Sequence, residues 1–99
     1  MTRREALEQI REAVLAGRYV LTAHAYQEMY ADNVTVPDVE TALLRGTMNR
    51  EYGDDPRGPR YHVVGTGTDL LTSVAVVVRL TNQGRVLIIT VFRLDFADD

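Results

Sequence analysis

The chain has 99 residues, a formal net charge of −3 and no cysteine. This length predicts one domain, spanning residues 1–99, with a hydrophobic core of its own. The absence of cysteine excludes disulfides, thiolate zinc sites and cysteine nucleophiles. The acidic balance counts against tight nonspecific nucleic-acid binding, although a local basic patch is compatible with it. All 11 basic residues are arginines.

The apolar segments are too short to insert into a membrane. The longest of them, Val74–Val78, is far shorter than the roughly 20 residues that a spanning helix needs. No apolar stretch of the signal-peptide type follows the charged start of the chain. We therefore expect no membrane association and a cytoplasmic location.

Three helices are predicted in the first half of the chain. Thr2–Glu5 and Thr35–Asp38 both match the capping box, in which two side chains satisfy free N–H groups at a helix start. Thr22 is the expected N-cap of the middle helix, and glycines end the other two. The expected helices lie within residues 1–17, over residues 23–31, and between Thr35 and Gly46.

The second half has the composition of β-strands. Runs of β-branched residues alternate with turns rich in glycine, proline and aspartate. Strands are expected over residues 48–52, 61–66, 71–80 and 85–93, with a short extended segment at 19–21. The sequence therefore predicts an α+β fold, with three N-terminal helices packed on a mostly antiparallel C-terminal sheet of about four strands.

The last two strands form a predicted hairpin around Asn82-Gln83-Gly84. A three-residue loop with Gly84 in the left-handed conformation fits the spacing. In this register Val76 faces Thr90, Val78 faces Ile88 and Leu80 faces Val86. The expected core face carries Val74, Val76, Val78, Leu80, Val86, Ile88, Thr90 and Phe92. The opposite face carries Ser73, Ala75, Val77, Arg79, Leu87, Ile89, Val91 and Arg93.

That opposite face of the hairpin is too apolar to be bare to water. A segment of the chain, a second copy or a partner protein should cover part of it. A slip of one residue in the register would exchange the two faces, because strand side chains alternate.

His24 and Glu28 are the first candidates for chemistry. A histidine has an ordinary pKa near neutrality and therefore suits general acid or base catalysis. Glu28, four residues later on the same helix, can orient it. The alternative is a surface histidine that only hydrogen-bonds to Glu28. His24, Glu28 and His62 are residue types that can bind a metal, but their spacing matches no strong motif, so we predict no metal and no cofactor.

The loop and strand start at residues 54–61 form the most distinctive segment. Arg57 and Arg60 can clamp a phosphate, and Tyr61 can stack on a base. The alternative is a rigid turn in which Arg57 pairs with Asp54 or Asp55.

Two further strand residues are candidates for substrate contacts. Thr90 interrupts an apolar strand face, where it either contacts a substrate phosphate or hydrogen-bonds within the strand. Arg79 and Arg93 project from the other face, and we assign Arg79 together with Arg60 to substrate binding.

A set of short segments extends along most of the chain. They are Tyr19–Ala25, Glu28-Met29, Val36–Glu40, Leu43–Gly46, Tyr52, Asp55–Gly58, Tyr61, Gly65 and Ile88–Val91. As a set they resemble a bacterial family catalogued as domain of unknown function 4258. The similar region covers about residues 19–92; the N-terminal helix precedes it, and residues 97–99 form a tail.

The family is similar to RelE-type and motility quorum-sensing regulator toxins. Those are small proteins that cleave mRNA without a metal, have helices packed on an antiparallel sheet, and are neutralised by an antitoxin protein. The resemblance implies RNA as substrate and an antitoxin as partner. It places His24, Arg57, Tyr61 and Thr90 among the functional residues.

These observations lead to two functional hypotheses. The first is a toxin-like, metal-independent ribonuclease. In it, His24 is the base or acid, Glu28 orients it, Arg57 and Arg60 clamp the phosphate, Tyr61 stacks or donates, and Thr90 supports. The second is a non-catalytic interaction module that forms a homodimer or binds a partner through an apolar strand face. The acidic charge and the absence of lysine favour the second. A small-molecule sensor, with its ligand between the second helix and the sheet, is a third reading.

Overall fold

The computed structural model describes residues 1–53 and 56–94. The expected tail at residues 97–99, and a pairing of Arg57 with Asp54 or Asp55, lie outside this part of the chain. Within it, three helices and five strands form. They are α1 (Arg3–Leu15), β1 (Tyr19–Leu21), α2 (Ala23–Asp32), α3 (Val36–Arg45), β2 (Thr47–Tyr52), β3 (Arg60–Thr66), β4 (Ser73–Leu80) and β5 (Val86–Leu94).

The helices begin at the predicted caps. The Thr2 hydroxyl accepts the Glu5 N–H at 3.1 Å, and the Glu5 carboxylate accepts the Thr2 N–H at 2.8 Å. The same pair of bonds between Thr35 and Asp38 opens α3. The middle helix, α2, ends at residue 32 rather than 31, because Asn33 adopts the left-handed C-cap conformation with φ of 58°. Within the described residues, no helix combines the length and the apolar character needed to cross a membrane.

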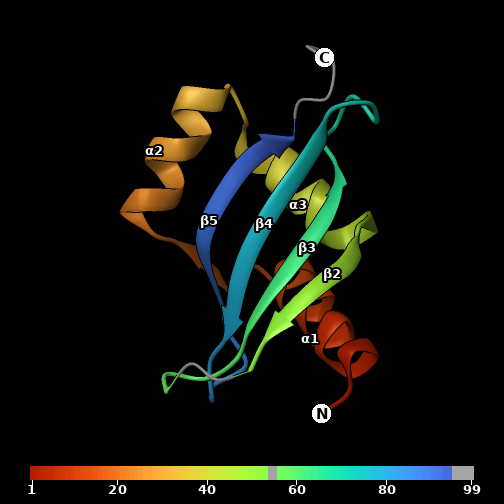
Figure 1. The fold of residues 1–99 in the computed structure, drawn as a ribbon, viewed down its shortest axis with the longest axis vertical. Helices are drawn as coiled ribbons and strands as arrows, with labels where there is room; N and C mark the ends of the chain where they lie inside the picture. Colours follow the sequence, from red (N-terminus) through yellow and green to blue (C-terminus); the bar gives the residue numbers. More distant parts are fainter. Residues whose placement is uncertain (54–55, 95–99) are drawn as a thin grey trace.

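The five strands form one sheet in the order β1-β5-β4-β3-β2 (Figure 1). The four strands from β2 to β5 pair antiparallel, whereas β1 pairs parallel with β5 through Tyr19, Val20 and Leu21. The α+β class and the antiparallel core of the sheet are confirmed. The expected count of about four strands is too low, because the short segment at residues 19–21 is itself a strand of the sheet.

Helices α1 and α3 pack on one face of the sheet, behind the strands in Figure 1. The core between them contains fully buried side chains, each of which stabilises the fold by roughly 1.5–3 kcal/mol. Helix α3 approaches β3 closely at Gly65, where an added Cβ would lie 2.5 Å from the Ala42 carbonyl oxygen. The largest of the buried side chains include Ile10, Val39, Leu43, Val63, Val76 and Ile88.

The hairpin of β4 and β5 contains an irregularity that the sequence did not predict. Val78 pairs with Ile88 as expected, but the next pair is Val77 with Thr90, so Ile89 is an extra residue on β5. The predicted pairing of Val76 with Thr90 is therefore wrong, since Val76 pairs with Val91.

One extra residue reverses the alternation of side chains along the rest of the strand. Val91 and Arg93, both predicted to lie on the opposite face, consequently lie on the core side of the sheet: Val91 is buried, and Arg93 pairs with Val74. Thr90 and Phe92, both predicted to lie in the core, belong instead to the sheet face opposite α1 and α3, which we call the open face.

Helix α2 lies along the edge of β5, beyond the point where β1 ends. The Thr22 hydroxyl donates to the Ile89 carbonyl at 3.2 Å. The N–H groups of Val91 and Arg93 donate to the carboxylates of Glu28 and Asp32, each at 3.0 Å. Side chains of α2 therefore satisfy the strand edge that a further strand would otherwise pair with.

Candidate functional site

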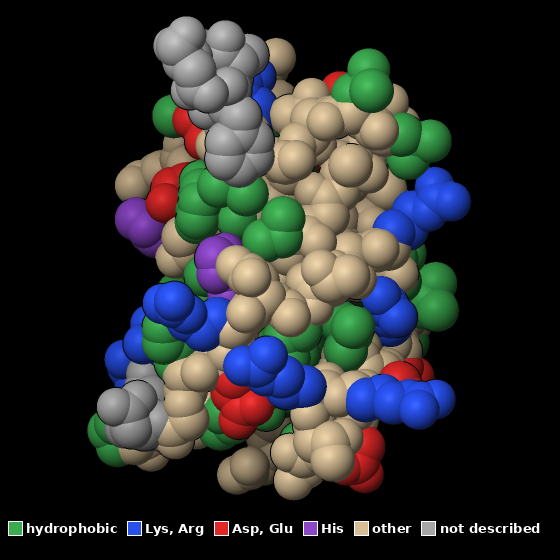
Figure 2. Space-filling model, turned by 45° about the vertical axis from the view of Figure 1, so that its right-hand side comes forward, with side chains coloured by type: hydrophobic (Ala, Val, Ile, Leu, Met, Phe, Trp, Pro, Cys, Tyr) green, Lys and Arg blue, Asp and Glu red, His purple; other side chains and the backbone are tan. Residues whose placement is uncertain are grey.

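The open face is organised in rows that run across the sheet from β2 to β5. Residues in register on neighbouring strands have Cβ atoms roughly 4.5–5.5 Å apart. Figure 2, a view that includes this face, shows both purple histidine side chains with blue arginine side chains below them. The first row is Tyr52, Arg60, Arg79 and Leu87; the second is Arg50, His62, Val77 and Thr90; the third is Thr47, Val64, Ala75 and Phe92.

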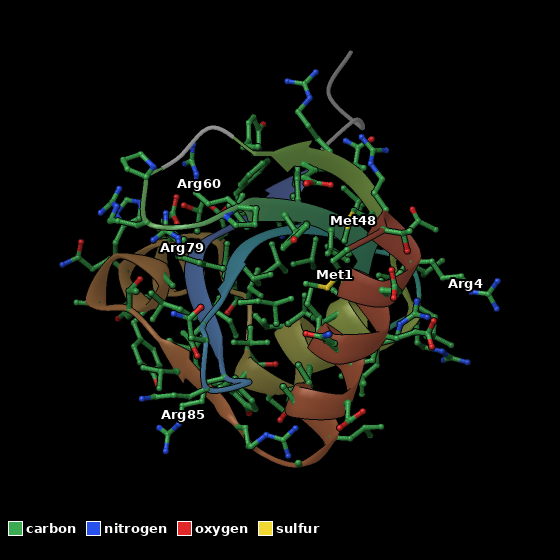
Figure 3. All side chains as sticks on the ribbon, turned by 90° about the horizontal axis from the view of Figure 1, so that it is seen from below. Met1, Arg4, Met48, Arg60, Arg79 and Arg85 are labelled. Carbon is green, nitrogen blue, oxygen red and sulfur yellow. The ribbon has the colours of Figure 1, made fainter. Side chains whose placement is uncertain are left out.

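The polar residues concentrate in the first two rows. We call Arg50, Tyr52, Arg60, His62 and Arg79 the open-face cluster. Arg60 and Arg79 pair directly across β3 and β4. Figure 3 shows both on the side of the sheet away from α1, with Arg85 well separated from them. Two like charges in register destabilise a sheet, so an anion bound here would stabilise it.

The two paired arginines differ in exposure. Arg79 is buried, with 8% of its surface exposed, and Arg60 is half-buried. Each guanidinium carries five N–H donors and can therefore hold a phosphate while it keeps other contacts.

Tyr52 lies within reach of two cationic groups of the cluster. The guanidinium carbon of Arg60 is 5.1 Å from the centroid of the tyrosine ring, and that of Arg50 is 5.8 Å from it. Both distances are in the range of cation–π attraction. The ring therefore helps to fix where the two positive charges lie.

His62 is at the centre of the open face. Its ring centroid is 6.0 Å from that of Phe92. The ring is half-buried, and its Nε2 atom is buried without a hydrogen bond to any described residue. Burial lowers the pKa of His62, and the positive charge of Arg50 lowers it further. The imidazole is therefore neutral at pH 7.

His24 and Glu28 lie outside the open-face cluster, on α2. The His24 Nε2 atom is 3.4 Å from the Glu28 carboxylate, as their spacing predicts, and 63% of the His24 side chain is exposed. The same Glu28 oxygen also accepts the Val91 N–H. Glu28 thus has a structural task, which is to hold α2 against β5.

Tyr61 does not lie beside the arginines. Residues 60 and 61 are consecutive on β3, so their side chains point to opposite faces of the sheet. Tyr61 points into the core and is 2% exposed. Burial raises the pKa of its phenol, and the charge of Glu51 adds to that rise.

The remaining predicted residues are divided between two places. Thr90 is half-buried on the open face, in the same row as His62 and next to the residue that Glu28 holds. Arg57 is exposed in the loop that leads into β3. The structure thus brings Arg60, Arg79 and Thr90 onto one face, places His24 and Glu28 at the margin of that face, and separates Tyr61 from all of them.

A polar cavity of about 270 Å³ lies at another part of the molecule. It is lined by residues of the α2–α3 junction, the turn between β3 and β4, and the end of β5, including Asp38, Asp69, Thr72 and Arg93. Asp38 and Asp69 already accept hydrogen bonds from Thr68 and Thr72, respectively. Within residues 1–53 and 56–94, no three histidine, aspartate or glutamate side chains gather closely enough to hold a metal ion.

A family model described as a domain of unknown function, DUF4258, matches residues 21–93. The chain belongs to this family. The DUF4258 match begins after α1 and includes α2, α3 and nearly all of the sheet, so the open-face cluster and the His24–Glu28 pair both lie within it. No curated protein and no solved structure matches the chain.

Three of the five residues of the open-face cluster are not predicted as substrate-site residues by the DUF4258 sequence alone. They are Arg50 and Tyr52, for which the sequence predicts no role, and His62, for which it suggests only a metal ligand. The signal was present as alternation: residues 50 and 52 share one face of β2, and residues 60 and 62 share one face of β3. The sequence alone did not predict which residues of β2 pair with which residues of β3.

Proposed function

We propose that this protein is a metal-independent ribonuclease of the toxin type, with its RNA site on the open face. The observation that carries the proposal is the pairing of Arg60 with Arg79, flanked in the same two rows by Arg50, Tyr52 and His62. In a chain with a net charge of −3, three arginines on adjacent strands form a local cationic site. A phosphodiester fits its charge.

The chemistry follows from the types of residue present. Arginines stabilise the negative charge that develops on the phosphate oxygens when the ribose 2′-oxygen attacks phosphorus. An aromatic ring such as that of Tyr52 provides a surface on which a base can stack. The reaction also needs a side chain that can accept or donate a proton near neutral pH. The resemblance to RelE-type toxins agrees with this chemistry and extends it to a neutralising antitoxin partner.

The test is cleavage of a mixed RNA pool by the purified protein in EDTA, with the product ends identified. Wild type is expected to give discrete products that carry a 2′,3′-cyclic phosphate and a 5′-hydroxyl. Arg60→Ala is expected to slow cleavage by about 100-fold, the scale seen when a group that stabilises a developing negative charge is removed. The matched control is Arg85→Ala, because Arg85 is exposed and lies away from the cluster. RNA that stays intact with wild type, including RNA on ribosomes, would refute the proposal.

A second candidate function is supported by the order of the strands. β2 is the terminal strand at one end of the sheet; at the other end the three-residue β1 pairs with the start of β5, and side chains of Thr22 and α2 bond to β5 beyond it. A strand with a free backbone edge can pair with a partner chain or with a second copy of itself. This interaction module predicts a light-scattering mass of at least two chains and no RNA cleavage. A monomeric mass together with RNA cleavage would exclude the hypothesis that the protein is a homodimeric interaction module.

The apolar part of the open face gives this second candidate less support than the sequence suggested. Val77, Leu87 and Phe92 are all half-buried. Val20 on β1, which pairs with Leu87, is a large apolar side chain in register with this face that is exposed. The most exposed ones lie on α1, on α2 and in the turn before β4, at Leu15, Tyr30 and Leu71.

A further inference from the structure

Two histidines are present, and only one of them lies among the arginines. His62 pairs with Arg50 on β2 and with Val77 on β4, and it follows Arg60 by two residues on the same face of β3. A substrate phosphate bound by the arginines would therefore bring its ribose close to this ring.

The His62 ring contacts Phe92 but, in the part of the chain that the structure describes, has an unused nitrogen. Within the described residues its Nε2 atom makes no hydrogen bond although it is buried. A buried polar nitrogen without a partner is rare in folded proteins and frequently marks a functional group. The half-buried ring also reaches the surface of the open face. His24, in contrast, is exposed and faces a carboxylate that already anchors α2.

Among the described residues, the charged side chains in the rows of the open face that contain or adjoin His62 are arginines. Arg50 faces it from β2, Arg60 from β3 and Arg79 from the next row on β4, while β5 contributes the uncharged Thr90 and Phe92. This environment disfavours the imidazolium in the free protein. A bound phosphate would offset the positive charges and make the imidazole a better proton acceptor.

We propose that His62 is the catalytic residue that takes the proton from the RNA 2′-hydroxyl; this assignment rests on the proposed function. As the O2′–H bond breaks, its proton moves to the His62 imidazole and the O2′–P bond forms. The P–O5′ bond breaks at the same centre, and the leaving 5′-oxygen takes a proton from solvent water. His62 then returns its proton to solvent, so the step consumes nothing except the RNA bond.

The experiment compares His62→Gln, His24→Gln and wild type in single-turnover cleavage across pH. A DNA oligonucleotide of the same sequence serves as a ligand that cannot be cleaved, because it lacks the 2′-hydroxyl. His62→Gln is expected to lower the cleavage rate by about 100-fold or more, the usual scale of a general base. Its affinity for the DNA should stay within about threefold of wild type. The rise of the wild-type rate with pH should disappear in this variant and persist in His24→Gln; its loss in His24→Gln instead would make His24 the base and refute the assignment.

A second measurement uses the folded wild-type protein and is independent of how His62→Gln folds. The two histidines give two imidazole C2–H resonances, which His24→Gln assigns. Addition of the DNA should raise the pKa of the His62 imidazole, because a phosphate stabilises a nearby imidazolium. The DNA should leave the C2–H resonance of His24 unchanged.

The outcomes separate this assignment from the proposed function. If wild type leaves RNA intact, both are overturned together. If His62→Gln cleaves RNA at the wild-type rate, or if the DNA shifts only the His24 resonance, then the assignment alone is wrong. A variant that loses rate and DNA affinity equally would make His62 a binding residue and would also refute a catalytic role.

Discussion

Tyr52 illustrates how a single ring can organise the charges of a site. It lies 5.1 and 5.8 Å from the guanidinium carbons of Arg60 and Arg50, and it is half-buried near the end of β2. Each cation–π contact at a partly exposed position contributes roughly 0.5–1 kcal/mol. Its loss would leave the two arginines free to sample more rotamers.

The first prediction concerns this ring. Tyr52→Leu should weaken RNA binding by about threefold to tenfold, which corresponds to the loss of one or two such contacts. Tyr52→Phe should bind RNA as wild type does, because phenylalanine keeps the ring that attracts the arginines. Fluorescence anisotropy with a labelled RNA measures both affinities. Equal weakening in the two variants would show that the hydroxyl, and not the ring, is what matters.

At the scale of single residues, the sequence identified some members of the site and misplaced others. Arg60 and Arg79 could be selected because arginine suits phosphate binding. Tyr61 could have been excluded from the site of Arg60 and Arg79, since the side chains of residues 60 and 61 point to opposite faces of one predicted strand. Thr90 could not be placed correctly, because its face depends on the extra residue at Ile89, which only the pairing of β4 with β5 reveals.

Contacts between elements explain why α3 is fixed at both ends. At its start, Asp38 accepts hydrogen bonds from the Thr35 N–H and from both the N–H and the hydroxyl of Thr68. The backbone bonds from Thr35 and Thr68 lower the pKa of Asp38 to about 2. At its end, the Arg11 guanidinium donates to the Gly46 carbonyl at 2.7 Å, which ties α1 to the end of α3.

The second prediction follows from this lowered pKa. The folded pKa lies below the unfolded value of about 3.9, so the ionised carboxylate stabilises the fold above pH 4, and this contribution is lost as pH falls toward 2. Asp38→Asn should therefore lower the free energy of unfolding by about 1 kcal/mol at pH 7, after allowance for screening of a partly exposed group. The difference from wild type should shrink between pH 4 and pH 2. Urea titrations at three pH values measure it; a difference independent of pH would contradict the expectation.

The third prediction concerns the crossing of α3 over β3. Gly65→Ala places a Cβ 2.5 Å from the Ala42 carbonyl oxygen and 2.9 Å from the Gly46 Cα, both of which are backbone atoms that cannot turn away. The free energy of unfolding should fall by about 2 kcal/mol or more. Gly53→Ala is the matched control, because its nearest neighbour is the end of the Glu51 side chain at 3.9 Å. Equal midpoints for the two variants in urea would show that α3 shifts without cost.

The fourth prediction concerns the attachment of α2 to β5. Glu28→Ala removes the acceptor of the Val91 N–H, so hydrogen exchange at that amide should accelerate by about tenfold, the scale of one hydrogen bond to a charged group. Glu28→Gln keeps a side-chain oxygen at this position and should exchange more slowly than the alanine variant. Amide exchange followed by NMR distinguishes the two. An unchanged rate in Glu28→Ala would show that another group protects Val91.

The elements themselves were largely predictable, for a local reason. Capping boxes and left-handed residues are signals within a few positions of each helix end, and they placed α1, α2 and α3 within a residue or two. β1 is different, because a strand of three residues is defined by its partner. Tyr19–Leu21 looked extended in sequence, but its membership of the sheet depends on β5, which lies more than 60 residues away in the chain.

At the scale of the whole molecule, the distribution of charge matters more than its sum. The net charge of −3 describes the chain, whereas RNA would meet the three arginines of the open face. Acidic side chains elsewhere, such as Glu5, Glu8 and Glu12 on α1, are exposed on a helix behind the sheet. The exposed carboxylates of α1 repel RNA, so we expect RNA to approach from the side of the open face.

The fifth prediction is the salt dependence of RNA binding. Each arginine that neutralises a phosphate of single-stranded RNA contributes about 0.7 to the slope of log affinity against log salt. Arg79→Ala and Arg60→Ala should each lower this slope by about that amount. Arg85→Ala should leave it unchanged, because Arg85 lies far from the cluster in Figure 3. Identical slopes for all of these variants would mean that RNA binds elsewhere.

The three side chains that α2 places along β5 also set a limit on self-association. With Thr22, Glu28 and Asp32 bonded to β5 beyond β1, the terminal strands of the described sheet are β2 and the three-residue β1, and β2 is the longer edge for pairing with another copy. If two copies pair through β2, each copy's β2 edge is occupied by the other, and the assembly is a closed twofold dimer. Removal of Glu28 and Asp32 together would leave the Val91 and Arg93 N–H groups of β5 open to another chain, so copies paired through β2 could add further copies, as a fibre does.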